Sequence, residues 1–204
     1  MSPDSVGLLA AIPVKPFGVA KARLSDQLSP DQRARLGKAI AARTAILSRQ
    51  AGADVFVVTG DDGVAQWAAG LGFAVLPEGP VPSLDGAARA AAATAAAREQ
   101  RWVIVHADLP LATATDLRTV FALAASAPVV VPAHDGGTNL LAGSDPAFPF
   151  AYGTGSFRRH LAAAPQAKVV PHPRLAMDLD TPTDLAHVRQ AGGGLWLAPF
   201  LALA

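Results

Sequence analysis

The chain contains no cysteine among its 204 residues. This absence excludes thiol nucleophiles, disulfide bonds and zinc sites built on cysteine. It is compatible with the cytoplasm, which is the location we expect. The first five residues, Met1–Ser5, also lack a cationic stretch followed by an apolar one, so they do not have the pattern of a signal peptide.

Charge is sparse as well, and neither sign dominates. Lysine and arginine number 17 against 16 acidic residues, which gives a formal net charge of +1. A chain without a basic field is not expected to bind nucleic acid, and any phosphate binding must come from a few placed cations. The apolar runs Leu8–Val14 and Leu195–Ala204 are too short to cross a bilayer, so we expect no membrane partner.

What the chain does have is hydrophobic residues, which make up 51% of it. Short apolar runs alternate with longer amphipathic segments along the sequence. The expected strands are Leu8–Ile12, Val55–Thr59, Phe73–Leu76, Trp102–His106, Val129–Val131, Asn139–Ala142 and Lys168–Val170. The expected helices are Pro30–Gln50, Asp61–Gly70, Asp85–Glu99, Thr113–Ala125, Ser156–Ala163 and Thr183–Ala191. This alternation predicts a single-domain α/β fold with a mostly parallel mixed sheet flanked by helices.

Local signals mark where these elements begin and where the domain stops. Ser29, Pro30 and Gln32 form a capping-box pattern at the start of the first helix. The folded domain is predicted to span residues 1–191, followed by a glycine-rich, apolar tail over residues 192–204. Two alternatives stay open for that tail: it frays, or it docks on a partner subunit in a homodimer.

Ligands of open α/β sheets bind beyond the carboxyl ends of the strands, so the loops there deserve most weight. The loop after the first strand places Lys15, Lys21 and Arg23 close together in sequence, and Gly18 lets a backbone approach a ligand. Such cations can cradle a triphosphate. The alternative is a solvated basic loop, and the loop does not have the Walker A pattern.

Acidic residues follow two other strands. Asp108 comes directly after the fourth expected strand, where a carboxylate can hold Mg²⁺ against a phosphate. Asp178 and Asp180 stand two residues apart, so an extended backbone would project both to one side, where a divalent cation would offset their repulsion. The alternatives are that Asp108 caps a turn, and that Asp180 and Asp184 only favour the start of a helix.

Two glycine-containing segments complete the candidate site. Asp135–Asn139 offers backbone amides and the hydroxyl of Thr138 to an anion, with a plain hairpin turn as the alternative. In the second segment, Tyr152–Ser156, we expect Ser156 to cap a helix whose free amides face the pocket. The residues that follow, Arg158, Arg159 and His160, either bind a carboxylate or form a solvated helix face.

Taken together, these segments resemble the 2-phospho-L-lactate (phosphoenolpyruvate) guanylyltransferase family, which serves the biosynthesis of coenzyme F-420. The resemblance extends from about Leu8 to Val188. The stretches that carry it are Ile12–Pro16, Ala20–Leu24, Ala107–Leu111, Gly136–Asn139, Tyr152–Phe157 with His160, and Asp178–Pro182. It implies a Rossmann-like nucleotide-diphospho-sugar transferase fold, so that residues 1–191 would form a nucleotidylyltransferase domain.

The resemblance also implies the chemistry and the residues for it. GMP would pass from GTP to a phosphorylated three-carbon acid, namely 2-phospho-L-lactate, phosphoenolpyruvate or 3-phosphoglycerate, with Mg²⁺ as cofactor. The implied catalytic residues are Lys15, Asp108 and Asp178. The implied nucleotide-binding residues are Lys15, Lys21, Arg23 and Asp85, the acid-binding residues are Thr138, Gly153 and Ser156, and the metal ligands are Asp108, Asp178 and Asp180.

One position departs from the family pattern. Members commonly carry a Leu-Asn pair where this chain has Leu84 and Asp85. Because that region lies near the nucleotide in this fold, Asp85 bears on nucleotide preference and on activity. Two alternatives therefore stay open: an inactive nucleotide-binding regulatory protein, and a nucleotidylyltransferase for another acceptor such as a sugar phosphate or molybdopterin.

Overall fold

The computed structural model describes residues 6–79 and 82–201, which form a seven-stranded sheet in the order β3-β2-β1-β4-β6-β5-β7. β6 runs antiparallel to both of its neighbours, β4 and β5, and the other paired strands are parallel. The strands are β1 (Leu8–Pro13), β2 (Asp54–Val58), β3 (Ala74–Leu76), β4 (Arg101–Val105), β5 (Val129–Pro132), β6 (Thr138–Gly143) and β7 (Lys168–Val169). The mostly parallel mixed sheet that the sequence predicts is confirmed.

Helices connect most of these strands, and their starts follow local capping chemistry. The N–H of Gln32 donates to Ser29 Oγ while the Ser29 N–H donates to Gln32 Oε1, so the predicted capping box is confirmed. Among the described residues no helix is long and apolar enough to cross a membrane. The helices are α1 (Pro30–Gln50), α2 (Asp62–Gly70), α3 (Leu84–Ala97), α4 (Ala114–Leu123), α5 (Ser156–Ala163), α6 (Pro182–Gln190) and α7 (Ala198–Leu201).

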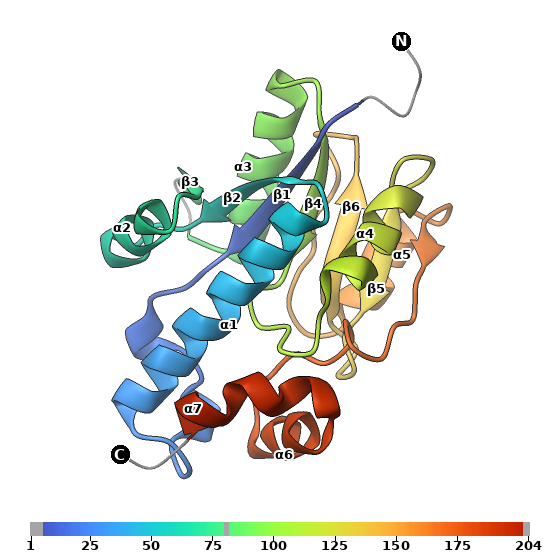
Figure 1. Ribbon diagram of the computed structural model, residues 1–204. Coiled ribbons are helices and arrows are strands. Elements are labelled where there is room, and N and C mark those ends of the chain that lie inside the picture. The colour runs from blue at the N-terminus through green and yellow to red at the C-terminus, as the bar shows by residue number, and fades with distance from the viewer. Residues whose placement is uncertain (1–5, 80–81, 202–204) are drawn as a thin grey trace.

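The sheet is covered on both faces, which explains why its strands are almost continuously apolar. In β1, Leu8, Ala10 and Ile12 pack with residues of α1, α2 and α4, whereas Leu9 and Ala11 pack with residues of α3 and of the segment leading to α5. Figure 1 shows α1 and α4 in front of the sheet and α3 behind it. The alternation within one strand therefore builds two separate cores.

The C-terminal segment packs on its own domain. Leu197, in the 3-10 helix Gly192–Leu197, is fully buried in a third apolar cluster with residues of α1 and α6. The indole N–H of Trp196 donates to the Pro110 carbonyl oxygen at 3.1 Å. At Gly194 a Cβ atom would collide with the Val188 carbonyl, so glycine is needed for this close return. Through Trp196 and Leu197 the tail therefore packs on its own domain.

The order of the strands locates the candidate site. From β1 the chain moves through β2 to β3 at one edge, and then crosses back to place β4 on the other side of β1. The loops after β1 and β4 therefore diverge at a topological switch point, where open α/β sheets form a crevice. In Figure 1 this carboxyl-end edge lies next to α6 and α7.

Candidate active site

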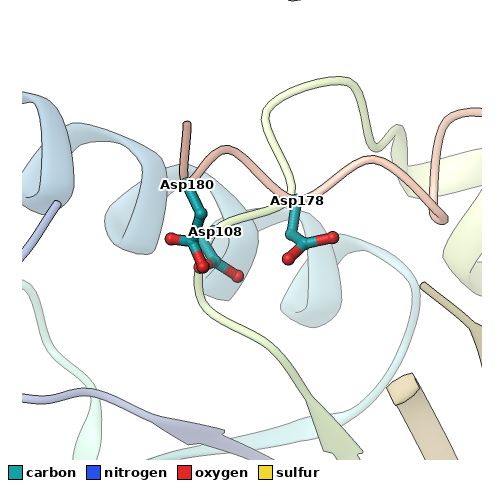
Figure 2. Close-up of side chains that lie close together, drawn as sticks. All are labelled: Asp108, Asp178 and Asp180. Atoms are coloured by element: carbon teal, nitrogen blue, oxygen red, sulfur yellow. The ribbon is translucent and has the colours of Figure 1, made fainter. Parts of the chain in front are cut away.

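Three carboxylates from two distant segments meet at this edge of the sheet. Asp108 lies in the turn after β4, and Asp178 and Asp180 lie in the extended segment that precedes α6. Each offers a carboxylate oxygen, and these oxygens all lie within 4.8 Å of one another. Figure 2 shows the three side chains turned toward a common region. The two-residue spacing of Asp178 and Asp180 places both on one side, as predicted.

The two acidic segments are joined by hydrogen bonds as well as by proximity. The Leu179 N–H donates to the Asp108 carbonyl oxygen at 3.1 Å. Asn139, buried on β6, donates through Nδ2 to Asp178 Oδ1 at 3.1 Å and to the Leu175 carbonyl oxygen at 3.0 Å. The sequence did not single out Asn139, although it orients one of the three carboxylates and fixes the backbone that leads to it.

Lys21 bridges two of the three carboxylates, those of Asp108 and Asp180. Its Nζ atom lies 2.8 Å from Asp108 Oδ2 and 2.9 Å from Asp180 Oδ1, and its side chain is only 7% exposed. The residue adopts the left-handed backbone conformation, with φ 55° and ψ 35°. Non-glycine residues rarely adopt it, and its cost is typically offset by a functional or structural constraint. Here the constraint is visible, because this turn aims the ammonium group at the two acids.

The pKa values of the cluster follow from burial and from these neighbours. Burial disfavours the charged form of Lys21, but the two carboxylates outweigh it and raise the pKa of the ammonium. Burial opposes ionisation of Asp108 too, yet the Lys21 charge holds the pKa of that carboxyl below its usual range. Burial and the nearby Asp108 charge together raise the pKa of Asp178. Among the described residues Lys21 pairs with Asp108 and Asp180, whereas the basic side chain nearest Asp178 is His134, with Nε2 at 3.8 Å from Oδ1.

The donor set of this cluster fits a hard divalent cation. Mg²⁺ prefers carboxylate oxygens, commonly one or two of them together with phosphate oxygens of a substrate. Asp108, Asp178 and Asp180 supply such oxygens within one small region, and the raised pKa of Asp178 shows a carboxylate whose charge a cation would favour. These three residues could therefore hold Mg²⁺.

The other basic residues of the first loop lie apart from the acids. Lys15 follows β1 in an extended stretch, and Arg23 lies on the short 3-10 helix Ala22–Leu24; both are exposed. Within the described part of the chain neither forms an ion pair, so each is free to reach a ligand from the rim. Lys21, predicted at a triphosphate together with them, is instead bound to the acidic cluster.

The predicted acid-binding residues Thr138 and Ser156 come together where the start of β6 meets the start of α5. Thr138 follows the β5–β6 hairpin, which confirms the hairpin interpretation of Asp135–Asn139. Its Oγ1 lies 3.1 Å from Ser156 Oγ and 3.0 Å from His160 Nδ1. The expectation that Ser156 caps a helix was wrong: Gly155, in the left-handed region, is the N-cap, and Ser156 is the first residue of α5. Its hydroxyl contacts Thr138 instead.

The loop that contains Gly153 is held by side chains from two helices. Arg159, on α5, donates to the carbonyl oxygens of Ala151, Tyr152 and Thr154 at 3.0, 3.0 and 2.6 Å. Gly153 itself has a φ of +104°, which only glycine adopts readily. Arg159 therefore neither forms a purely solvated face nor points to a ligand; it fixes the backbone of this loop.

Asp85 also helps to fix the backbone of the loop that contains Gly153. Its Oδ1 accepts a hydrogen bond from the Tyr152 N–H at 2.8 Å, which ties the start of α3 to the loop. An asparagine side chain carries an equivalent carbonyl oxygen, so the Leu-Asn pattern of the family would preserve this bond. The departure at Asp85 therefore keeps the acceptor and adds a negative charge.

A second ion pair, between Arg174 and Asp116, joins the two acidic segments outside the carboxylate cluster. Asp116, in the first turn of α4, is buried and accepts hydrogen bonds from Arg174 Nε at 2.7 Å and from Arg174 Nη2. Its Oδ1 also lies 3.3 Å from His172 Nε2. Because α4 follows the Asp108 turn and Arg174 precedes Asp178, this pair clamps together the chain segments that carry the metal-binding candidates.

Replacing Arg174 with methionine should lower the free energy of unfolding by about 1.5 kcal/mol at pH 7, since it removes charge-assisted bonds from a buried carboxylate but half of the guanidinium is already in water. Arg174 helps to hold the pKa of Asp116 below its usual value, against burial. The Asp116 contribution is therefore present above about pH 4 and is lost as pH falls through the folded-state pKa. Urea unfolding at a series of pH values from 7 down to about 2 checks both points.

Arg158→Met, an exposed change on α5, serves as the control and should stay within about 0.5 kcal/mol of the wild type. A difference between the Arg174 variant and the wild type that persists undiminished well below pH 3 would show that the stabilisation does not come from the Asp116 charge.

Comparison with known proteins gives this geometry a context. The chain matches the guanylyl transferase CofC-like family over residues 8–202. It is 35% identical to a phosphoenolpyruvate guanylyltransferase of Salinispora arenicola, across 90% of this chain and 88% of that protein. It is 32% identical to a 2-phospho-L-lactate guanylyltransferase of Methanothermobacter thermautotrophicus, across 94% of this chain and 88% of that protein.

Solved structures agree on the fold. A protein of Desulfovibrio desulfuricans G20, described as a nucleotide-diphospho-sugar transferase, superimposes with a TM-score of 0.73 at 17% identity, covering 96% of this chain and 97% of its own. A nucleotidyl transferase of Methanothermobacter gives a TM-score of 0.60 at 17% identity, covering 90% and 96%. The sequence match over nearly the whole chain, on a fold shared with nucleotidyl transferases, shows that this protein belongs to the guanylyl transferase CofC-like family.

Proposed function

We propose that this protein transfers GMP from GTP to the phosphate of a small phosphorylated acid, with Mg²⁺ as cofactor and diphosphate as the second product. The observation that carries the proposal is the meeting of Asp108, Asp178 and Asp180 at the switch point of the sheet, where Lys21 pairs with two of them, Asp108 and Asp180. Membership of the family makes the chain a nucleotidyltransferase. The acceptors named for its relatives, phosphoenolpyruvate and 2-phospho-L-lactate, are the first candidates, and 3-phosphoglycerate is a third.

The nucleotide side of the site would be built on the acidic cluster. Asp108, Asp178 and Asp180 would hold Mg²⁺, which supplies neutralisation of the triphosphate charge when it is bound. Lys15 and Arg23, both exposed at the rim, would add positive charge along the triphosphate. Lys21 keeps Asp108 ionised, and with it a ligand oxygen available for the cation.

The acceptor side would be the pair Thr138 and Ser156 together with Gly153. A phosphate monoester is a dianion near neutral pH, so its oxygen can attack the α-phosphorus of GTP without a general base. The new P–O bond forms as the bond to the β-phosphate breaks, and diphosphate leaves with the electron pair. What the protein must supply is in-line positioning and charge stabilisation.

Release of diphosphate from GTP tests the proposal directly. The purified protein is incubated with GTP and Mg²⁺, with and without 2-phospho-L-lactate, phosphoenolpyruvate or 3-phosphoglycerate. We expect acid-dependent release with at least one of the three and none in EDTA, because the carboxylates would then lack their cation. A product mass equal to the acid plus GMP less water identifies the reaction.

The same assay separates the competing interpretations. Binding of GTP without release under any of these conditions would contradict the proposal and favour an inactive nucleotide-binding protein. Release that depends on a sugar phosphate and not on a phosphorylated acid would place the acceptor in another chemical class. An active enzyme would belong to the biosynthesis of a deazaflavin coenzyme of the F-420 type, as the resemblance implies.

A further inference from the structure

His160 is the most deeply buried titratable side chain beside the proposed acceptor site, and both of its ring nitrogens are engaged. It lies on α5 and is 0% exposed. Its Nε2 accepts a hydrogen bond from the backbone N–H of Ala151 at 3.1 Å, and its Nδ1 lies 3.0 Å from Thr138 Oγ1. Nothing in the proposed reaction requires this histidine as an acid or a base, so its position calls for another explanation.

The Ala151 contact fixes the tautomer of the ring. A backbone N–H can only donate, so Nε2 must present its lone pair to it. Burial lowers the pKa of the His160 imidazole to about 4, which keeps the ring neutral near pH 7. A neutral ring carries one N–H, and that hydrogen is therefore on Nδ1. The contact between His160 and Thr138 is thus an Nδ1–H that donates to the threonine hydroxyl.

Because His160 donates to Thr138 in this hydrogen bond, the ring does not use a hydroxyl hydrogen of the Thr138–Ser156 pair. Thr138 and Ser156 carry two hydroxyl hydrogens between them, and one is used in the 3.1 Å bond that joins their oxygens. Because the ring donates and does not accept, it uses neither. No other acceptor contacts these two hydroxyls in the part of the chain that the structure describes. Thr138 is 1% and Ser156 2% exposed, so the pair is closed to bulk water, and one of its hydroxyl hydrogens is left without an acceptor within this buried pair.

The opposite tautomer would reverse the outcome. With its lone pair on Nδ1, the ring would accept the hydrogen of Thr138, and Ser156 would have to donate to Thr138. Both hydroxyl hydrogens would then be used, and the pair would offer only lone pairs, which repel an anion. The tautomer of His160 therefore determines whether the pair attracts or rejects a phosphate or carboxylate oxygen.

We propose that His160 is a positioning residue whose Nδ1–H tautomer, set by the Ala151 backbone, reserves one hydroxyl hydrogen of Thr138 and Ser156 for the phosphorylated acid. The inference rests on the proposed function, because it assigns that function's acceptor to this pair. The side chain itself does not touch the acid. It acts through the two hydroxyls, and through its hydrogen bond with the backbone N–H of Ala151, at the start of the loop that leads to Ser156.

Kinetics of paired variants test the role. His160→Leu removes the donor and should raise the KM of the acid about tenfold or more, as expected for a lost bond to a charged group, while the KM of GTP stays within about twofold. His160→Asn keeps an N–H near Thr138 and should recover part of the loss. His187→Asn, the same change on the exposed last turn of α6, is the matched control and should leave both constants unchanged.

A double-mutant cycle asks whether His160 acts through Thr138. In a Thr138→Val background the hydroxyl is gone, so adding His160→Leu should raise the acid KM by no more than about twofold further. A full tenfold loss in that background, or equal rises in the two KM values, would contradict the inference, since either result would indicate a general structural role.

Nitrogen NMR of the histidine rings in the wild-type protein gives a readout that does not depend on turnover. In the ¹⁵N-labelled wild-type protein the His160 resonances, identified by their loss in His160→Asn, should show Nδ1 protonated and Nε2 unprotonated at pH 7. Inorganic phosphate should shift the Nδ1 signal as it binds. An Nε2–H tautomer overturns the inference. If no acid supports diphosphate release, the proposed function fails, while the tautomer and the phosphate response still decide the role of His160.

Discussion

Replacing Asp108 with asparagine should lower the turnover number at least about a hundredfold, because an anionic ligand worth several kcal/mol of transition-state stabilisation becomes neutral. The change preserves the shape of the side chain, and the amide oxygen can still accept the hydrogen bond from Lys21 Nζ. We therefore expect the fold to persist. The kcat of the purified variant with GTP, Mg²⁺ and the best acid of the panel is the measurement, accompanied by thermal unfolding.

The matched control is Asp62→Asn, the same substitution at an exposed position in the first turn of α2. It should leave turnover unchanged and alter stability by no more than about 0.5 kcal/mol. Near-normal turnover of the Asp108 variant would remove this residue from the metal role. If that variant kept near-normal turnover but were much less stable than the wild type, the Asp108 carboxylate would have a purely structural role.

Replacing Lys21 with methionine should destabilise the protein when no divalent cation is present. The ammonium neutralises two carboxylates at 2.8 and 2.9 Å from a side chain that is 7% exposed. Removing one partner of such a buried group leaves uncompensated charge, and because Asp180 is 46% exposed we expect a loss near the low end, about 2 kcal/mol. Urea unfolding in EDTA measures it.

Adding millimolar MgCl₂ should recover part of that loss, since a cation bound to the freed carboxylates stabilises the folded state in proportion to its occupancy. Lys168→Met, an exposed change on β7, is the control. Its free energy of unfolding should lie within about 0.5 kcal/mol of the wild-type value, and MgCl₂ should change it by no more than that. A deficit of the Lys21 variant that Mg²⁺ leaves untouched would argue against cation binding at this cluster.

The sequence predicted well where the governing interactions are local. The start of α1 depends on Ser29 and Gln32, which are three residues apart. Their capping box was predicted from the sequence and is confirmed. The strands were predictable because apolar residues cluster over a few consecutive positions. Thr181 likewise caps α6 and forms a capping box with Asp184, so the interpretation that Asp184 favours the helix start is confirmed, although its carboxylate also lies 3.3 Å from His134 Nε2.

The predicted cap at Ser156 failed for a reason that no local pattern contains. Thr138, 18 residues earlier, lies at 3.1 Å and takes the hydroxyl that would otherwise have bonded a helix amide. The left-handed Gly155 then serves as the N-cap without a side chain. Capping rules describe which local partner a serine prefers, and a tertiary partner overrides them when packing brings one within reach.

By itself the sequence determined the α/β class, most of the strands and helices, and the two acidic segments that hold Asp108, Asp178 and Asp180. Only the tertiary structure decided which residues meet: Lys21 with Asp108 and Asp180, 87 and 159 residues away, and Asn139 with Asp178. The reason is physical. Periodicity, capping and turn chemistry act over a few residues, whereas an ion pair across the sheet exists only after strand order and helix packing have fixed where each loop ends.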